Sequence, residues 1–299
     1  MKVSDYWLDE LEKSKALDLD LTIEQLFDTN LNIKWHQFSY TSLYNERIYG
    51  WLLEPKVQGS YPLVIDYLGY MNHLESPLQF NHWLEIGCGV LVTDSRGQGG
   101  RTLDQTAYQI KYEEGLMSSG FLEKEDFYLR RLYWDALRLV DVAWQLPKVD
   151  KSKVFIHGTS QGGGVGLFTN SVTPHEIRYG FYDVPSHSNI ANRVKNGTGS
   201  YQGIYQHLLK YPAQRDKIYK NLAYFDIKNI VHQIKNPVLV SVGNLDPVCP
   251  KEDFEKAYQE IKSFKELICY PEPGHGGGGQ SHETKILETI LKELSGEII

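Results

Sequence analysis

Ser160 is the residue whose surroundings most directly predict chemistry. It stands in Gly158-Thr-Ser-Gln-Gly162, a match to the pattern G-x-S-x-G. The run Val154-Phe-Ile-His157 before it predicts a short buried strand, and Val165 to Phe168 after it predict the start of a helix. A sharp turn between the two holds the serine in a strained backbone, and glycine on both sides removes side chains that would collide. We therefore predict a serine hydrolase; the alternative is a glycine-rich turn with an incidental serine.

A serine hydroxyl is a weak nucleophile unless a histidine accepts its proton and a carboxylate orients that histidine. After a G-x-S-x-G turn the carboxylate and then the histidine usually follow in chain order, each at the end of a strand. Asp246 and Asp183 both stand at the ends of apolar runs. We favour Asp246, because Gly243 and Pro247 beside it suit a loop that turns a carboxylate inward. Asp183 is the alternative, and it could instead be a hydrogen-bond partner at the end of its strand.

Two late histidines are candidates for the base. His275 lies in the glycine-rich segment 273–279, directly after the last apolar run, whereas His282 is followed by Glu283 in a segment with helical spacing. Position favours His275 as the base, and we interpret His282 as a residue on the helix surface. The histidines lack the spacing of metal ligands and have no pair of thiols beside them, so we predict neither a metal nor a cofactor.

The reaction would also need donors for the negative charge that develops on the carbonyl oxygen. The backbone N–H of Gln161, at the start of the predicted helix, is one candidate. Tyr70 is the other, because Gly69-Tyr70 follows the apolar run 63–67 in the loop where this type of site takes its second donor. Loss of one such donor typically lowers the rate by about a hundredfold to a thousandfold.

Apolar and alternating patterns predict the elements that would position these residues. A leading hairpin is followed by alternating strands and helices, which indicates an α/β fold with a mainly parallel sheet and helices on both faces. The chain is predicted to form one domain over residues 1–299, with an N-terminal helical arm (1–33), a long excursion (101–125) and a cap-like helical insertion (187–234). The predicted strands are eight: 33–41, 47–53, 63–67, 89–93, 154–157, 178–183, 237–242 and 265–270.

Composition excludes several other classes of protein. The net charge is −7 over 299 residues and there is no basic block, so nucleic acids and anionic membranes are not expected partners. No apolar run is long enough to span a membrane, and the first residues do not resemble a signal peptide. Cys88, Cys249 and Cys269 are far apart in apolar surroundings, so we expect buried free thiols and a cytoplasmic protein.

Several motifs together resemble the acetyl xylan esterase and cephalosporin C deacetylase group, carbohydrate esterase family seven of the α/β-hydrolase superfamily. The resemblance runs from about residue 34 to the C-terminus. Its signature is a combination of Arg96-Gly-Gln98, the Ser160 motif and the late His275, with Asp246 between them. Further segments with counterparts in the group are 66–70, 127–131, 182–185 and 241–246.

The resemblance implies a deacetylase with Ser160, Asp246 and His275 as catalytic triad and Tyr70 and Gln161 as backbone oxyanion donors. It also implies an acetylated small-molecule substrate, such as acetylated xylo-oligosaccharides or cephalosporin C, and a ring-shaped homohexamer. In the group a Glu usually follows the histidine, whereas this chain has Gly276. The alternatives are a broader carboxylesterase or peptidase on the same fold, or a ligand-binding homologue without catalysis.

Arg96 and Gln98 are assigned a structural role. Their loop neighbours the loop of the nucleophile, and a guanidinium there can brace several carbonyl groups at once.

Overall fold

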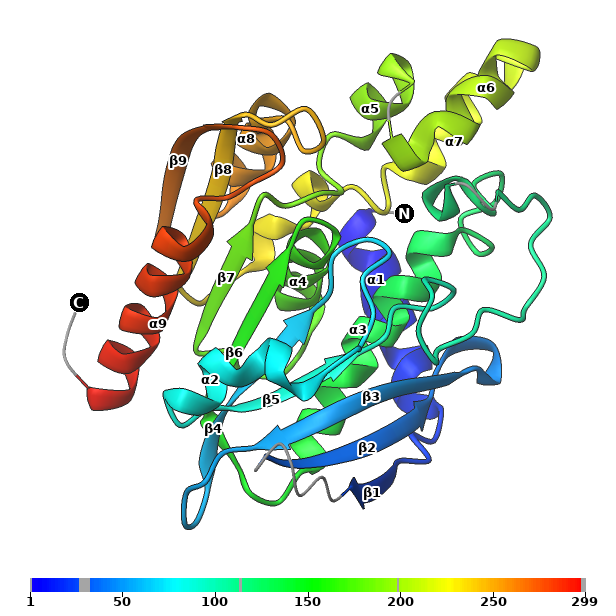
Figure 1. The fold of residues 1–299 in the computed structure, drawn as a ribbon. Helices are drawn as coiled ribbons and strands as arrows, with labels where there is room; N and C mark the ends of the chain where they lie inside the picture. Colours follow the sequence, from blue (N-terminus) through cyan, green and yellow to red (C-terminus); the bar gives the residue numbers. More distant parts are fainter. Residues whose placement is uncertain (1, 27–32, 113–114, 198, 297–299) are drawn as a thin grey trace.

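The computed structural model describes residues 2–26, 33–112, 115–197 and 199–296. Its centre is a twisted sheet of nine strands in the order β1-β2-β3-β5-β4-β6-β7-β8-β9 (Figure 1). The six strands from β5 to β9 in that order run parallel, and β1, β2 and β3 form antiparallel pairs at one edge. The strands are β1 (Thr22–Leu26), β2 (Lys34–Thr41), β3 (Arg47–Glu54), β4 (Tyr61–Tyr67), β5 (Gly89–Thr93), β6 (Val149–Thr159), β7 (Tyr179–Asp183), β8 (Val238–Leu245) and β9 (Lys265–Pro273).

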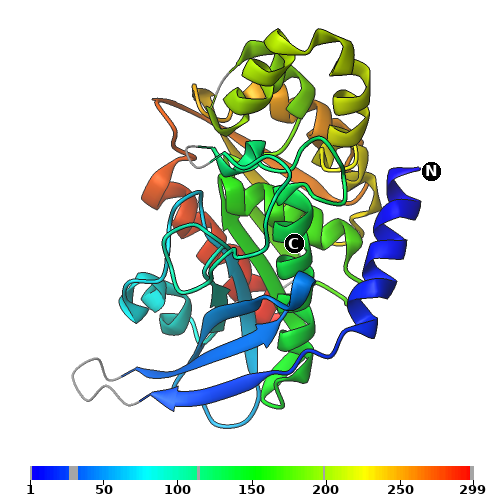
Figure 2. The same cartoon turned by 90° about the vertical axis from the view of Figure 1, so that its right-hand side faces the viewer.

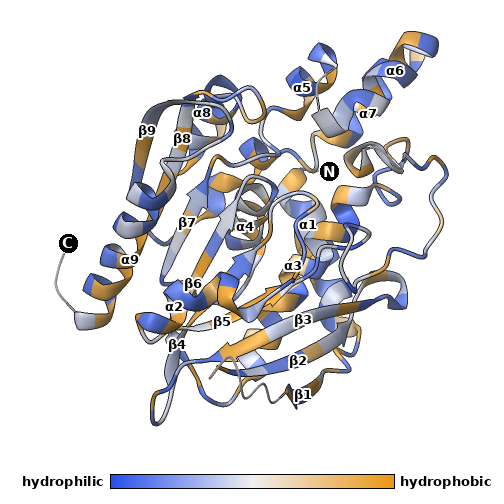
Figure 3. Cartoon of the chain, viewed as in Figure 1, coloured by the Kyte–Doolittle hydropathy of each residue, from blue (hydrophilic) through white to orange (hydrophobic). Residues whose placement is uncertain are grey.

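Alternation along the strands divides the core into two layers. In β4, Leu63 and Ile65 belong to one apolar cluster and Val64 to the other, because successive side chains point to opposite faces of a sheet. The larger cluster packs under α1 (Val3–Ala16), α3 (Tyr128–Gln145) and α4 (Gln161–Val172). The smaller cluster packs under α2 (Asn81–Glu85) and α9 (Gly279–Ser295). Figure 3 shows hydrophobic residues along the inner strands of the sheet. The structure therefore has the α/β-hydrolase layering that the sequence predicts.

The N-terminal region corrects one prediction. Among the described residues of the arm, only Val3–Ala16 is helical, and residues 22–26 form β1, which adds a ninth strand to the eight predicted. The side chains of residues 22–26 are largely exposed, so the segment has no apolar stripe that a helix could bury. They pair instead with the free edge of β2. Residues 1 and 27–32 of the predicted arm lie outside the described residues.

The predicted insertion after β7 consists of short helices joined by turns. They are α5 (Ile190–Asn196), α6 (Gln202–Lys210) and α7 (Arg215–Leu222). Figures 1 and 2 show them at one end of the molecule, beyond the carboxyl ends of β6 and β7, with α1 along one side. The remaining helix is α8 (Lys251–Glu260). This placement puts helical segments next to the edge of the sheet where the candidate residues lie.

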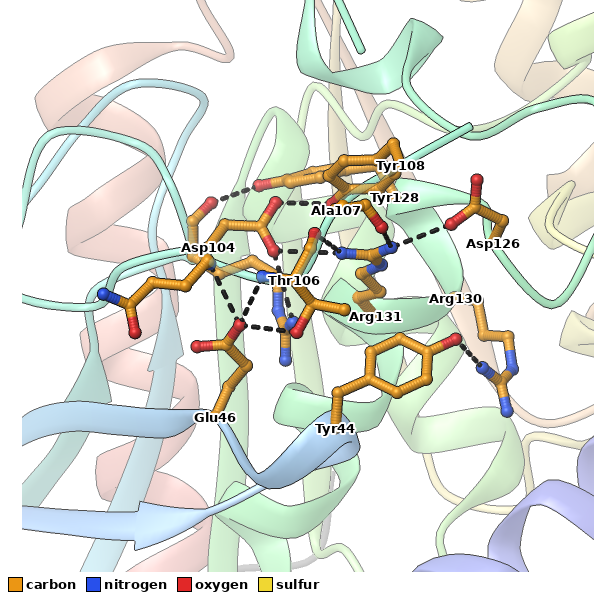
Figure 4. A network of polar contacts seen from close by, with 12 residues as sticks. Tyr44, Glu46, Asp104, Thr106, Ala107, Tyr108, Asp126, Tyr128, Arg130 and Arg131 are labelled. Atoms are coloured by element: carbon orange, nitrogen blue, oxygen red, sulfur yellow. Dashed lines mark hydrogen bonds and ion pairs between the residues drawn. The ribbon is translucent and has the colours of Figure 1, made fainter. Parts of the chain in front are cut away.

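Arg131 of α3 anchors the long excursion that follows β5 (Figure 4). Its buried guanidinium donates to the carbonyl oxygens of Thr106 at 2.7 Å and Ala107 at 3.1 Å. It also donates to Asp126 at 2.9 Å and to Asp104 at 3.3 Å. One charged group thus fastens both ends of a segment that has few strand or helix contacts of its own.

The cysteines match the prediction only in part. Cys88 and Cys249 are buried free thiols, and burial raises the pKa of Cys88 to about 12. Cys269 is exposed on β9, so its predicted burial is wrong; its thiol contacts the side-chain oxygen of Asn244 at 3.3 Å. The edge position of β9 explains this, because one side of an edge strand has no neighbouring strand to cover it.

Candidate active site

Ser160 forms the tight turn between β6 and α4. Its backbone has φ 59° and ψ −114°, a strained conformation for a residue with a side chain. The surrounding backbone holds it in this conformation: the Ser160 N–H donates to the Asp183 carbonyl at 2.8 Å. Its own carbonyl accepts from the N–H groups of Gly164 at 3.1 Å and Ser186 at 2.9 Å. Three backbone hydrogen bonds thus stabilise the strained conformation of Ser160.

The two glycines of the motif are required by space. A Cβ on Gly158 would stand 2.3 Å from the carbonyl oxygen of Gly162, and one on Gly162 would stand 1.8 Å from that of Tyr67. Neither contact is possible between real atoms. The turn therefore packs directly against the end of β4, which brings the loop after β4 beside Ser160.

Ser160, His275 and Asp246 meet at the carboxyl edge of the sheet. His275 Nε2 lies 2.8 Å from Ser160 Oγ, and His275 Nδ1 lies 2.7 Å from Asp246 Oδ2. A carboxylate only accepts hydrogen bonds, so the Asp246 contact places the proton on Nδ1 and leaves Nε2 free to accept from the serine hydroxyl. This is the hydrogen-bonded order in which a histidine can act as a base on a serine.

Asp246 is held rigidly. Its carboxylate is 0% exposed, and its second oxygen accepts from the backbone N–H groups of Val248 at 2.8 Å and Cys249 at 3.0 Å. His275 is 28% exposed, so its ring faces the Asp246 carboxylate on one side and remains reachable on the other. The Asp246 carboxylate is therefore fixed in the interior, and the His275 ring remains accessible.

The predicted oxyanion residues lie on two adjoining loops. Gln161 is the first residue of α4, so its N–H belongs to the first turn, which has no intrahelical acceptor. The side chain of Gln161 donates to the Leu68 carbonyl at 3.4 Å, next to the loop of Tyr70. The Tyr70 hydroxyl accepts from the N–H of Leu116 at 3.2 Å, so the excursion also holds this loop.

Gln98 joins these two loops. Its Oε1 accepts from the N–H of Met71 at 2.8 Å, and its Nε2 donates to the side chain of Gln161 and to the Tyr128 hydroxyl, both at 2.8 Å. Gln98 is fully buried, so these bonds are shielded from water.

Arg96 differs from the prediction in its partner. It was expected to brace carbonyl groups, but its guanidinium donates two bonds of 2.6 Å to the carboxylate of Asp135 on α3. Burial lowers the pKa of Arg96, but Asp135 outweighs this effect and raises it, so the group stays charged. The expectation was wrong because the partner lies in α3, whose contact with this loop no local sequence pattern reveals.

The two alternative residues contact each other. His282 Nε2 lies 3.0 Å from Asp183 Oδ1, whereas His275 is the histidine that contacts Ser160 and Asp246. His282 is 1% exposed, so its assignment to the helix surface was wrong. The inward side of the first turn of α9 is polar here because a carboxylate of β7 lies opposite it.

The buried Asp66 and the partly buried His157 were missed in the sequence. His157 Nδ1 lies 2.9 Å from Asp66 Oδ1, and its Nε2 lies 3.4 Å from Asp183 Oδ2. The Asp66 carboxylate also accepts from the indole of Trp83 at 3.1 Å. A signal was available, since Asp66 and His157 are charged residues inside apolar strand runs, and such residues are rarely buried without partners.

The family comparison decides which kind of protein has this arrangement. The acetyl xylan esterase (AXE1) family model matches residues 2–292. The chain belongs to the acetyl xylan esterase family. This agrees with the family resemblance that the motifs indicated.

Individual members of the family are similar over most of the chain. The acetyl xylan esterase of Paenibacillus sp. R4 has a TM-score of 0.90 and 27% identity, covering 96% of this chain and 93% of that one. Acetyl Xylan Esterase 1 of Thermoanaerobacterium sp. JW/SL YS485 has a TM-score of 0.89 and 25% identity, covering 97% and 93%.

A curated relative is longer. The acetyl esterase Axe7A of Xylanibacter ruminicola is 27% identical over 245 residues, which are 80% of this chain and 55% of that protein. The chain thus spans about half the length of this curated relative.

The described residues contain no cluster of three or more His, Cys, Asp or Glu side chains arranged to hold a metal ion. Within those same ranges, none of the helices has both the length and the apolar character of a membrane span.

Proposed function

We propose that the chain is a serine esterase that removes acetyl groups from acetylated xylo-oligosaccharides or similar small esters such as cephalosporin C. The observation that carries the proposal is the continuous chain of contacts from Ser160 Oγ through His275 to the buried Asp246, at 2.8 and 2.7 Å. Membership of the family supplies the acetyl ester as the class of substrate.

In the first half of the proposed reaction, Ser160 Oγ attacks the acetyl carbonyl carbon while His275 Nε2 accepts the hydroxyl proton. Asp246 stabilises the resulting imidazolium and keeps Nδ1 as a donor. The carbonyl oxygen becomes an oxyanion, which the N–H groups of Gln161 and Tyr70 bind. When the carbon–oxygen bond to the alcohol breaks, His275 returns the proton to the leaving oxygen.

The second half releases the acyl group. Water attacks the acetyl-serine while His275 accepts one of its protons, and collapse of the intermediate frees acetate and restores the Ser160 hydroxyl. In this mechanism His275 Nε2, which lies 2.8 Å from Ser160 Oγ, serves as the general base in both halves, so no other base is required.

A chain-length series of p-nitrophenyl esters tests the proposal. We expect kcat/KM to be highest for acetate and to fall steeply from propionate to butyrate and longer chains. A preference for longer chains would instead indicate a general carboxylesterase, and no turnover of any ester would indicate a ligand-binding protein. Acetate release from acetylated xylo-oligosaccharides and from cephalosporin C would then rank the two substrates.

We also propose that six copies assemble into a ring, as the resemblance to carbohydrate esterase family seven implies. Light scattering after size-exclusion chromatography should give six times the 34.4 kDa of one chain. The mass of a single chain or a dimer would contradict this assembly.

A further inference from the structure

The loop that carries His275 has little intrinsic rigidity. It joins β9 to α9, and Gly274 and Gly278 in it have φ of 93° and 89°. Glycine has the largest backbone freedom of any residue, so a run of four, Gly276 to Gly279, does not fix its own conformation. Displacement of a reacting group by about 1 Å can lower a rate by about a hundredfold. Contacts from outside the loop must therefore hold His275 within reach of Ser160.

Asp183 is placed to provide this support. Its backbone carbonyl accepts from the N–H of Ser160 at 2.8 Å. Its side-chain Oδ1 accepts from the Ser241 hydroxyl at 2.9 Å and lies 3.0 Å from Nε2 of His282 in the first turn of α9. One residue of β7 thus contacts both the backbone of the nucleophile and the helix that ends the His275 loop.

Two glycines of the loop pack against side chains that contact Asp183 or His282. A Cβ on Gly277 would lie 2.3 Å from the Ser241 hydroxyl, and a Cβ on Gly278 would lie 2.3 Å from the ring of Tyr270. The Tyr270 hydroxyl lies 3.1 Å from Nδ1 of His282. The loop therefore lies directly on side chains whose polar atoms contact Asp183 or His282.

Two histidines, His157 and His282, hold the side chain of Asp183 in place. Burial raises the pKa of this carboxyl, but contacts with His157 and His282 outweigh it and lower the pKa well below its usual range. Burial also lowers the pKa of His157, but Asp66 and Asp183 raise it to about 10. An ionised carboxylate between two imidazole rings in the interior has few alternative positions.

We propose that Asp183 and His282 form a positioning pair that fixes the loop of His275 relative to Ser160. The inference rests on the proposed function, because it assigns a reason for the reach of the base. Neither residue touches the substrate. The pair acts through the loop: it sets the distance between His275 Nε2 and the hydroxyl, and so the rate of acylation.

The test compares His282→Leu with His282→Gln. Leucine is similar to histidine in size but removes both polar contacts, whereas glutamine retains an N–H that can reach Asp183. With p-nitrophenyl acetate we expect kcat to fall by about tenfold to a hundredfold in His282→Leu with little change in KM. His282→Gln should recover most of the rate. A rate measured with a fluorophosphonate probe, which phosphonylates an activated serine, should follow the same order.

A matched control separates positioning from general loss of stability. His175 and Asp141 of α3 form another His–carboxylate pair at 3.0 Å. His175 comes just before β7, whereas Asp183 is the last residue of that strand. His175→Leu should leave kcat at the wild-type value. Equal kcat in the wild type and His282→Leu, or an equal loss in His175→Leu, would overturn the proposal. If His282→Leu does not fold, Asp183→Asn decides: a lower kcat supports the pair, and a wild-type kcat overturns it.

The reactivity of the wild-type protein separates the positioning pair from the proposed function. If the wild type neither hydrolyses the ester nor reacts with the fluorophosphonate, Ser160 is not an activated nucleophile and the proposed function fails. If the wild type reacts and the His282 variants react equally fast, only the positioning pair fails.

Discussion

Ser160 occupies a backbone conformation that few L-amino acids adopt, and its neighbours make that conformation possible. The neighbouring backbone leaves no room for a Cβ on Gly158 or Gly162. Three backbone hydrogen bonds fix the peptide groups on both sides of the serine. The strain at one residue is thus balanced by ordinary hydrogen bonds nearby. The small residues of the motif serve the placement of a hydroxyl rather than flexibility.

Gly162→Ala should destabilise the protein. The added Cβ would stand 1.8 Å from the carbonyl oxygen of Tyr67, so β4 or α4 must move, at a cost of about 1–3 kcal/mol in the free energy of unfolding. Urea denaturation followed by circular dichroism measures this loss.

Gly276→Ala is the matched control for stability. No atom lies within 4 Å of a Cβ added there, and its φ is outside the left-handed region. Its free energy of unfolding should equal that of the wild type. Equal stability of Gly162→Ala and the wild type would contradict the close approach of α4 to β4.

At the residue scale, chain position favoured the three residues that the structure brings together, with Asp183 and His282 left as alternatives. Ser160, Asp246 and His275 each follow a recognisable strand, and the carboxyl ends of parallel strands meet at one edge. The pairing of Asp183 with His282 could not be predicted in this way, because it joins a strand to a helix about a hundred residues later. A buried polar residue looks like a surface residue until its partner is known.

At the element scale, the predicted strands are present but several boundaries differ. The strand before Ser160 was predicted over residues 154–157 and extends over Val149–Thr159. Its first half is polar, so composition gave no sign of a strand; pairing of Val149 with Tyr61 of β4 extends it. The strand β1 was missed for the same reason, since its pairing with β2 rather than burial stabilises it.

The excursion after β5 depends on a helix rather than on its own structure. Arg131→Met should release it, because Asp104, Asp126 and two carbonyl groups would lose their buried donor. We expect the free energy of unfolding to fall by about 3 kcal/mol or more. Trypsin should cleave after Arg101 or Lys111 faster than in the wild type.

The control for this prediction is Arg215→Met, at the exposed start of α7. Its stability should stay within about 0.5 kcal/mol of the wild type. Unchanged proteolysis of Arg131→Met would show that other contacts are sufficient to hold the excursion.

At the scale of the whole molecule, the charged groups Asp66, His157 and Asp183, on the side of the sheet that α2 and α9 cover, link stability to pH. The pKa of His157 is raised to about 10, because Asp66 and Asp183 outweigh its burial. In the unfolded chain a histidine titrates near about 6.5. The folded state therefore holds this proton more tightly, and the stabilisation is complete below about pH 6.5 and lost as the pH rises toward about 10.

Urea denaturation between about pH 6 and pH 10 tests this coupling. The free energy of unfolding of the wild type should fall with rising pH more steeply than that of His157→Gln, which has no proton to lose. Parallel curves for the two proteins would contradict a charged His157. On the acid side, the lowered pKa values of Asp66 and Asp183 predict a loss of stability as the pH falls below about 4.

The esterase mechanism as a whole depends on a single nucleophile, so the most direct test is the turnover of p-nitrophenyl acetate by Ser160→Ala, with circular dichroism to verify the fold. Removal of the hydroxyl should lower kcat by at least about a thousandfold while the spectrum stays that of the wild type. A correctly folded Ser160→Ala protein that hydrolyses the ester at the wild-type rate would contradict the account.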